Sequence, residues 1–248
     1  MAKRRIGLLG GCGGIGRALV AACLGDGHDV AVLDLKSSLA RHPSPSGTVA
    51  IEIDGSVEAS VMEAFENIGK LWGALDGFVN AAGFLITKQD LARTSASEFD
   101  STIDGNLRTA FLCCKAATAL LERGEGPSLV NIASGLGGFI RPQYGPYAMA
   151  KAGMIALTKT LALEHAPRIR ANTVAPGPVD TAFLRGGTGR STEDKPVSLD
   201  IAAYNAIIPL KRVATPDDIV GPVMFLLGPQ SAYMTGQTLW VNGGAYMP

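Results

Sequence analysis

The chain has 248 residues, of which 47% are hydrophobic and 18% are charged, a composition typical of a folded globular protein. Its 22 lysine and arginine residues balance 22 aspartate and glutamate residues, so no nucleic-acid or anionic-membrane partner is indicated. This length suits a single large α/β domain.

The first residues argue against a signal peptide or a membrane span. Met1–Arg5 is basic, and the apolar run Ile6–Leu9 breaks at once into glycines, so it is too short for either. Without a secretory signal, we expect a cytoplasmic protein with reduced thiols. The cysteines are Cys12, Cys23, Cys113 and Cys114. The three histidines are scattered without metal-ligand spacing, so no metal site is expected.

Short apolar runs alternate with longer amphipathic stretches, which predicts repeated βα units around a parallel sheet. Strands are expected at Arg5–Gly10, Asp29–Asp34, Thr48–Ile53, Leu75–Asn80, Pro127–Ala133, Arg168–Val174 and Gln237–Asn242. Helices are expected at Gly14–Gly25, Val57–Gly69, Ser97–Glu122, Tyr147–Glu164 and Pro216–Leu227. The predicted fold class is α/β, with a doubly wound, mostly parallel sheet in three layers and one domain over residues 1–248.

The first expected strand runs into a glycine-rich turn, Gly10–Gly16, from which a helix is expected to start. Glycines at positions 10, 14 and 16 let the backbone turn tightly and approach a pyrophosphate, and the following helix offers unpaired N–H groups. A glycine-rich run alone also fits a flexible turn. Its position between a strand and a helix favours dinucleotide binding.

Asp34 ends the second expected strand, 18 residues after Gly16. A carboxylate there accepts hydrogen bonds from ribose hydroxyls and repels a 2′-phosphate. Neither Leu35 nor Gly13 supplies an arginine for that phosphate, although Lys36 could soften the preference. We therefore expect NAD as the cofactor in preference to NADP.

Tyr147 and Lys151 are four residues apart at the start of an expected helix, so their side chains share one face. An ammonium group beside a tyrosine is expected to lower the phenol pKa. Such a pair is common by chance, but Ser134 follows a strand 13 residues earlier, at the carboxyl edge where parallel sheets place their sites. Asn106, in the preceding long helix, is a candidate buried amide that holds a water beside Lys151.

The chain resembles the short-chain dehydrogenase/reductase family over essentially its whole length. The resemblance rests on motifs whose order and spacing match together: Gly10-xxx-Gly14-Ile15-Gly16, Asp54, Asn80-Ala81-Ala82-Gly83, Asn106, Ser134, Tyr147-xxx-Lys151 and Pro176-Gly177-Pro178-Val179-Asp180-Thr181. It implies a Rossmann-type fold and a nicotinamide-dependent oxidoreductase acting on CH–OH groups.

The resemblance also implies residue roles. Tyr147 would be the general acid or base, Ser134 would hold the substrate oxygen, and Lys151 would grip the nicotinamide ribose and tune Tyr147. Asn106 would complete a proton-relay water site. Asp54 and Gly55 would lie near the adenine, Asn80 and Gly83 along the cofactor, and Val179 and Thr181 at the nicotinamide amide. The expected cofactor-binding residues are then Gly10, Gly14, Ile15, Gly16, Asp34, Asp54, Gly55, Asn80, Ala81, Gly83, Tyr147, Lys151, Pro176, Gly177, Val179 and Thr181.

Three positions depart from the family pattern. Leu9 replaces the usual threonine before the first glycine, Ala81 replaces the second asparagine of the asparagine-rich motif, and Asn242 stands where an aspartate is common. We expect the first two to affect cofactor affinity and not the chemistry.

The substrate pocket is expected to be mostly apolar, with a lining of Leu136, Phe139, Gln143, Tyr144, Phe183, Leu184 and Tyr204. This lining favours a secondary alcohol or ketone with an apolar or aromatic body. Arg141 fits a solvated loop arginine better than a partner for a substrate carboxylate. The long irregular segment Thr181–Pro209 is predicted to be a lid over the substrate.

Two other functions stay open. One is an NADPH-dependent 3-oxoacyl thioester (acyl-carrier-protein) reductase, a common specialisation in the family, against which Asp34 without an adjacent arginine argues. The other is a non-catalytic nicotinamide-binding regulator, against which the intact set of catalytic candidates argues.

The resemblance implies a homotetramer, assembled through Ser97–Glu122, Tyr147–Glu164 and the C-terminal strand. Candidate interface side chains are Leu107, Ala110, Phe111, Cys114, Met154, Leu157 and Leu161. The same apolar helix faces would also cover a sheet in a monomer.

Overall fold

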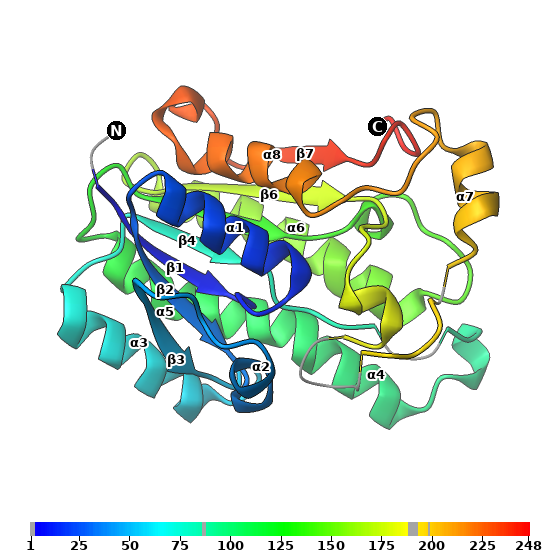
Figure 1. The fold of residues 1–248 in the computed structure, drawn as a ribbon, viewed down its shortest axis with the longest axis horizontal. Helices are drawn as coiled ribbons and strands as arrows, with labels where there is room; N and C mark the ends of the chain where they lie inside the picture. The colour runs from blue at the N-terminus through cyan, green and yellow to red at the C-terminus, as the bar shows by residue number, and fades with distance from the viewer. Residues whose placement is uncertain (1–2, 86–87, 188–192, 198) are drawn as a thin grey trace.

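The computed structural model describes residues 3–85, 88–187, 193–197 and 199–248. In this part of the chain, one sheet of seven parallel strands forms the centre of the molecule (Figure 1). The strands are β1 Arg5–Leu9, β2 Asp29–Asp34, β3 Thr48–Glu52, β4 Gly77–Asn80, β5 Ser128–Ile132, β6 Arg170–Pro176 and β7 Thr238–Val241. Their order, β3-β2-β1-β4-β5-β6-β7, is that of a doubly wound dinucleotide-binding fold. The predicted fold class is confirmed.

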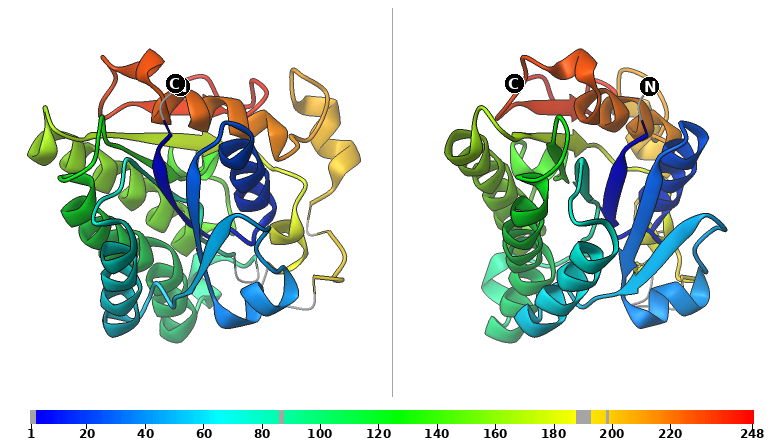
Figure 2. Two further views of the ribbon diagram at one scale, coloured as in Figure 1. Left: turned by 60° about the vertical axis from the view of Figure 1, so that its left-hand side comes forward. Right: turned by 90° about the vertical axis from the view of Figure 1, so that its left-hand side faces the viewer.

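Helices cover both faces of the sheet, as Figure 2 shows. One face packs against α1 Gly14–Gly25 and α8 Asp217–Leu227, and the other packs against α3 Glu58–Trp72, α5 Thr109–Leu121 and α6 Gly145–His165. Because both faces are covered, the strands are almost continuously apolar, and each fully buried large side chain contributes about 1.5–3 kcal/mol to stability. Among the described residues, no helix has the length and hydropathy needed to cross a membrane.

The order of the strands reverses between β1 and β4, which lie side by side at the centre of the sheet. A crevice opens at the carboxyl ends of strands at such a reversal. The amide of Gly10 donates to the carbonyl of Leu33 at 2.8 Å, and the amide of Ala81 donates to that of Leu9 at 2.8 Å. The glycine turn after β1 is therefore held between the ends of β2 and β4.

The predicted helix Ser97–Glu122 is interrupted in the structure. It consists of α4 Ala96–Ile103 and α5, joined by a π-helical turn, Asp104–Arg108. α4 starts one residue earlier than expected because Ser95 and Glu98 accept hydrogen bonds from each other's backbone amides in a capping box.

Two short helices have no counterpart among the expected elements: α2 Lys36–Arg41 and α7 Ile201–Ile207. Both are too short to show a helical period in the sequence. α7 belongs to the segment predicted as a lid, which also contains a 3-10 turn, Ala182–Arg185. Residues 188–192 and 198 of that segment lie outside the described residues.

Most of the candidate interface side chains belong to the core of the single chain. Ala110, Cys114 and Met154 are fully buried and Leu161 is nearly so, because they face the sheet or a neighbouring helix. Phe111, by contrast, is half exposed on α5. At those four positions, the apolar pattern of the helices therefore reflects packing within one chain.

The four cysteines lie buried as free thiols. Burial raises the pKa of Cys12, Cys23 and Cys114 to about 12, so these thiols stay protonated and unreactive at neutral pH.

Candidate active site

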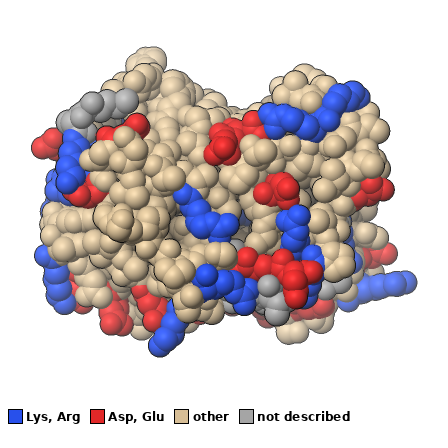
Figure 3. Space-filling model, viewed as in Figure 1, with Lys and Arg blue, Asp and Glu red and all other residues tan. Residues whose placement is uncertain are grey.

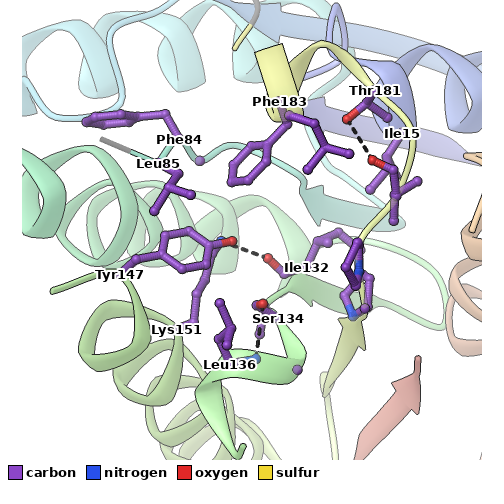
Figure 4. Close-up of a pocket in the computed structure, with 18 of the residues that line it drawn as sticks. Ile15, Phe84, Leu85, Ile132, Ser134, Leu136, Tyr147, Lys151, Thr181 and Phe183 are labelled. Carbon is purple, nitrogen blue, oxygen red and sulfur yellow. Dashed lines mark hydrogen bonds between the residues drawn. The ribbon is translucent and has the colours of Figure 1, made fainter. Parts of the chain in front are cut away.

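A cavity of about 690 Å³ opens at the carboxyl edge of the sheet. Its wall includes the glycine turn, the residues that follow β2, β3 and β4, and the segments that follow β5 and β6. Figure 4 shows Ser134, Tyr147 and Phe183 around this space, each coming from a different element. The cavity brings together residues that are widely separated in the sequence.

The turn after β1 has no room for side chains at its glycines. A Cβ atom on Gly16 would lie 2.1 Å from the carbonyl oxygen of Gly10, and one on Gly14 would lie 2.5 Å from Cγ2 of Thr181. Gly10 also has φ +78°, a conformation that glycine adopts without strain. No side chain caps the start of α1, so its first N–H groups can hold a ligand. This cradle fits a dinucleotide cofactor, whose pyrophosphate it would hold.

Asp34 ends β2 with its carboxylate held by the backbone. Oδ2 accepts a hydrogen bond from the amide of Cys12 at 2.9 Å, and Oδ1 accepts one from the amide of Leu35 at 2.8 Å. Asp34 and Leu35 both line the cavity. Lys36 is instead directed to β3, where its Nζ lies 4.0 Å from Oε2 of Glu52 and its side chain is 83% exposed.

The expected cofactor-binding residues line the cavity, with one exception. Those that line it are Gly10, Gly14, Ile15, Gly16, Asp34, Asp54, Gly55, Ala81, Gly83, Tyr147, Lys151, Pro176, Gly177, Val179 and Thr181. The exception is Asn80, which is fully buried. Its Nδ2 donates to Oδ1 of Asn131 at 3.0 Å, and its Oδ1 accepts from the amide of Ala82 at 3.1 Å. Asn80 therefore shapes the turn after β4.

Tyr147 lies in the first turn of α6, which Pro146 helps to start by fixing φ. Its ring is nearly buried and lies against Phe183, with 5.9 Å between the ring centroids. Burial raises the pKa of Tyr147, and a hydrogen bond with Ser134 opposes that rise. Ser134 Oγ also accepts from the amide of Leu136 at 3.2 Å, which fixes its hydroxyl after β5. The phenol is therefore protonated at neutral pH.

Lys151 lies one turn further along α6 and is almost fully buried. Its Nζ donates to the carbonyl of Ile132 at 3.1 Å and lies 5.6 Å from the ring centroid of Tyr147. Burial lowers the pKa of Lys151 to about 7. The expectation that this ammonium group lowers the phenol pKa is therefore not met here, because burial acts on both groups and its effect dominates.

Asn106 and Lys151 face one small space beside Gly83. Nδ2 of Asn106 donates to the carbonyls of Phe84 at 3.0 Å and Thr102 at 2.9 Å, which fixes the amide. Its buried Oδ1 has no hydrogen-bond partner among the described residues. A Cβ atom on Gly83 would lie 2.7 Å from this oxygen and 3.0 Å from Lys151 Nζ. A buried acceptor calls for a partner, and a water between these two atoms would satisfy it.

The π-helical turn places Asn106 at this point. A Cβ atom on Gly105 would lie 2.0 Å from the ring of Phe84, so the turn packs directly on the segment after β4. Single π-helical turns inside helices are frequent at functional sites. The spacing of apolar residues in the sequence gives no signal of this turn.

The substrate end of the cavity is lined by aromatic and aliphatic side chains. The expected residues that line it are Leu136, Phe139, Tyr144, Phe183, Leu184 and Tyr204. Gln143 is not part of this lining: its φ is +71°, and it lines a small neighbouring pocket. Arg141 is exposed in a loop, as expected, and it also lines the cavity. Residues that sequence reasoning missed also line it: Phe84, Leu85, Lys88, Leu199, Ile207, Ile208, Pro209 and Tyr246.

Asn242, which departs from the family pattern, closes a turn after β7. Its Nδ2 donates to the carbonyl of Tyr246 at 2.8 Å, and its Oδ1 accepts from the amide of Gly244 at 3.0 Å. This turn carries Tyr246 to the cavity wall. An amide can make both hydrogen bonds, whereas an ionised carboxylate could only accept.

The chain matches the family model described as enoyl-(acyl carrier protein) reductase over residues 10–246. It is 33% identical to the 3-oxoacyl-[acyl-carrier-protein] reductase FabG of Staphylococcus epidermidis, over 94% of this chain and 95% of that protein. It is 34% identical to an uncharacterized short-chain type dehydrogenase/reductase of Sinorhizobium fredii over 97% of this chain, which spans only 43% of that longer relative.

A solved structure of similar fold is the ligand-free aldohexose dehydrogenase of Thermoplasma acidophilum. The TM-score is 0.87 with 27% sequence identity, covering 99% of this chain and 97% of that one. The sequence matches and this structural likeness agree with the glycine cradle and with the grouping of Ser134, Tyr147 and Lys151. The chain therefore belongs to the short-chain dehydrogenase/reductase family, whose members are oxidoreductases that bind a nicotinamide cofactor.

Proposed function

We propose that the protein is an NAD-dependent oxidoreductase that transfers a hydride between its cofactor and a secondary alcohol or ketone with an apolar or aromatic body. The observation that carries this proposal is the pairing of Tyr147 with Ser134 at the wall of a cavity that also contains the glycine cradle. Asn106, Ser134, Tyr147 and Lys151 are the proposed catalytic set.

A bound nicotinamide supplies the hydride for reduction and accepts it in oxidation. In reduction, the hydroxyl groups of Ser134 and Tyr147 hold the substrate oxygen, and Tyr147 donates its proton as negative charge develops there. The phenol stays protonated at neutral pH, the form that this step needs, although a raised pKa also makes it a weaker acid. In oxidation, Tyr147 must first lose its proton and then takes that of the alcohol.

Lys151 and Asn106 would return the proton to Tyr147. Lys151 has one N–H bonded to Ile132 and further N–H groups for a ribose hydroxyl and a water. The unpartnered Oδ1 of Asn106 would accept from that water. A pKa of about 7 lets Lys151 gain and release a proton near neutral pH.

The preference for NAD is proposed from Asp34. Its carboxylate lies at the cavity wall, fixed by two backbone amides, where it would accept from ribose hydroxyls. The same negative charge would oppose a 2′-phosphate. Lys36 is exposed, and its Nζ lies 4.0 Å from Oε2 of Glu52, the register partner of Asp34, so the preference is argued from Asp34 alone.

A second candidate is an NADPH-dependent 3-oxoacyl-[acyl-carrier-protein] reductase. The likeness to FabG of Staphylococcus epidermidis favours it. The cofactor separates the two candidates, because this alternative needs NADPH to bind despite Asp34.

The segment 181–209 is proposed as a lid over the substrate. Its described residues Phe183, Leu184, Tyr204 and Ile207 line the cavity. A homotetramer and a cytoplasmic location stay predictions, the half-exposed Phe111 of α5 being a candidate contact between subunits.

The test is a fluorescence titration of the purified protein with NADH and with NADPH, followed by assays with aromatic secondary alcohols and NAD. Tighter NADH binding together with NAD-dependent turnover supports the proposal. Tighter NADPH binding with reduction of 3-oxoacyl thioesters would replace it by the second candidate. Binding of either cofactor without turnover of any alcohol or ketone would point to a non-catalytic protein.

A further inference from the structure

The charged residues that line the cavity differ between its two ends. Asp34 and Asp54, which follow β2 and β3, lie at the cofactor end. Lys88 and Arg141 lie among the aromatic residues of the substrate end. Among the described residues, no other aspartate or glutamate lines the cavity. On the face that Figure 3 shows, acidic and basic side chains are interspersed, so the separation seen in the cavity is not repeated there.

Arg141 rests on a stack of aromatic rings. Its guanidinium carbon lies 4.2 Å from the ring centroid of Phe139. Phe139 in turn stacks on Tyr246, with 5.3 Å between centroids and 9° between the rings. Tyr246 meets Trp240 of β7 edge-on at 5.0 Å. The guanidinium is thus supported from the sheet, and stacking leaves its in-plane N–H groups able to bind an oxyanion.

Among the described residues, Arg141 is not one of the arginines that form an ion pair with a carboxylate. The ion pairs of arginines in the described part of the chain are those of Arg5, Arg41, Arg185 and Arg212. Burial raises the pKa of Tyr204 on α7, and the positive charge of Arg141, which lines the same cavity, opposes that rise. A Cβ atom on Gly177 would lie 3.1 Å from the Tyr204 hydroxyl, which places this tyrosine at the cavity wall.

We propose that Arg141 selects substrates that carry a carboxylate on their apolar or aromatic body. Because a guanidinium fork matches a carboxylate in a bidentate pair, Arg141 would orient the substrate while Tyr147 acts on its oxygen. Lys88, whose Nζ lies 5.3 Å from the ring centroid of Tyr144, adds positive potential at the same end. The protein is then an oxidoreductase of oxo and hydroxy acids.

This inference rests on the proposed function and keeps its chemistry. In reduction, the carbonyl carbon gains a hydride from the reduced nicotinamide, which is thereby oxidised. The π electron pair of the carbonyl moves to the oxygen, which takes the proton of Tyr147. The carboxylate is not consumed, so its pairing with Arg141 affects binding and orientation only.

The expected effect is large because the aromatic stack has already ordered the arginine. An exposed ion pair alone contributes little, but a bound substrate would cover Arg141 and strengthen the pair. Charge-assisted hydrogen bonds of this kind correspond to about a 10- to 100-fold change in kcat/KM.

The experiment compares aryl keto acids of increasing linker length with their methyl esters, using NADH. Each compound is assayed with the wild-type protein, Arg141→Gln, Arg141→Lys and the control Arg93→Gln, which changes an exposed arginine of the 3-10 turn Leu91–Arg93. We expect the wild-type protein and Arg93→Gln to prefer one acid over its ester by about 10- to 100-fold. In Arg141→Gln, kcat/KM should fall much more for the acid than for its ester, so that the preference is lost, and Arg141→Lys should keep part of it. The dissociation constant of NADH should not change.

Two results separate this inference from the proposed function. Reduction of the esters with no preference for any acid overturns the role of Arg141 and leaves the proposed function standing. If no compound is reduced, the dissociation constants of the acids for the protein–NADH complex decide. If an acid binds more tightly than its ester and Arg141→Gln abolishes the difference, the carboxylate site at Arg141 is supported and the proposed oxidoreductase reaction is overturned. If acid and ester bind equally, the carboxylate site is overturned.

Discussion

The two ends of the cavity are built by different means. The cofactor end consists largely of backbone, with glycines that have no room for a Cβ atom and a carboxylate fixed by amides of the first two βα units. The substrate end consists of side chains from segments far apart in the sequence, such as Phe139 and Tyr246. The cofactor end is therefore tied to the sheet, while the substrate end can change its chemistry without disturbing the fold.

Tyr147 stands where the two ends meet, and its removal should have the largest effect. We expect Tyr147→Phe to lower kcat about 1,000-fold, because the proton route is lost while the ring keeps its packing against Phe183. NADH binding, measured by fluorescence titration, should change less than about threefold. Turnover close to that of the wild-type protein would disprove the assignment of Tyr147.

A substitution at Gly83 tests whether a water lies between Asn106 and Lys151. In Gly83→Ala, the new methyl group would lie 2.7 Å from Oδ1 and 3.0 Å from Nζ, so it would occupy the proposed water position. We expect kcat to fall about 100-fold, as for other small displacements in active sites. The control is Gly221→Ala in α8, where the methyl group meets open space and should only stabilise the helix, by about 1 kcal/mol. Equal kcat values for the two variants would contradict the water site.

The two directions of the reaction should respond to pH with opposite signs. The raised pKa of Tyr147 keeps the phenol protonated at neutral pH, the form needed for reduction. Oxidation needs the phenolate, whose population rises about tenfold per pH unit below that pKa. We therefore expect initial rates of oxidation to climb from pH 7 to pH 9 while rates of reduction do not. Parallel profiles would show that another group limits both directions.

Asp34 tests the cofactor end directly. Asp34→Asn keeps an acceptor for the amide of Cys12 but removes the charge. We expect NADH to bind about tenfold more weakly and NADPH no more weakly than before, so the ratio of the two dissociation constants shifts. Lys36→Gln is the matched control and should change this ratio less, since the Lys36 side chain is 83% exposed and its charge is screened by solvent. If the ratio of the NADH and NADPH dissociation constants changes only in Lys36→Gln, the cofactor preference is set by Lys36 and not by Asp34.

We expect the smallest effect from a substitution of Phe183, and we expect it to change substrate binding and not cofactor binding. Phe183→Ala removes a ring 5.9 Å from that of Tyr147 and leaves the glycine cradle intact. We expect KM for an aromatic ketone to rise about fivefold to tenfold, with no change in the dissociation constant of NADH. Equal changes in both constants would mean that the two ends are not independent.

The fold and the cofactor end could be predicted from the sequence because both depend on local spacing. The spacing of apolar residues predicted the strands and helices of the sheet, and the positions of the glycines predicted the cofactor cradle. The π-helical turn around Asn106 and the short helices α2 and α7 could not be predicted, because they are shorter than the window of about 11–18 residues in which a helical period can be recognised. The substrate end depends on contacts such as that of Arg141 with the Phe139–Tyr246 stack, which no local pattern reveals.

The turn that Asn242 closes has a practical consequence for any experiment on this protein. It carries Tyr246 to the cavity wall and leaves Met247 and Pro248 exposed beside it. An affinity tag fused after Pro248 would begin three residues after Tyr246, whose ring stacks on the Phe139 ring that supports Arg141. Fusions for assays and crystals therefore belong before β1, whose first residue, Arg5, lies at the amino edge of the sheet and not at the carboxyl edge where the cavity opens.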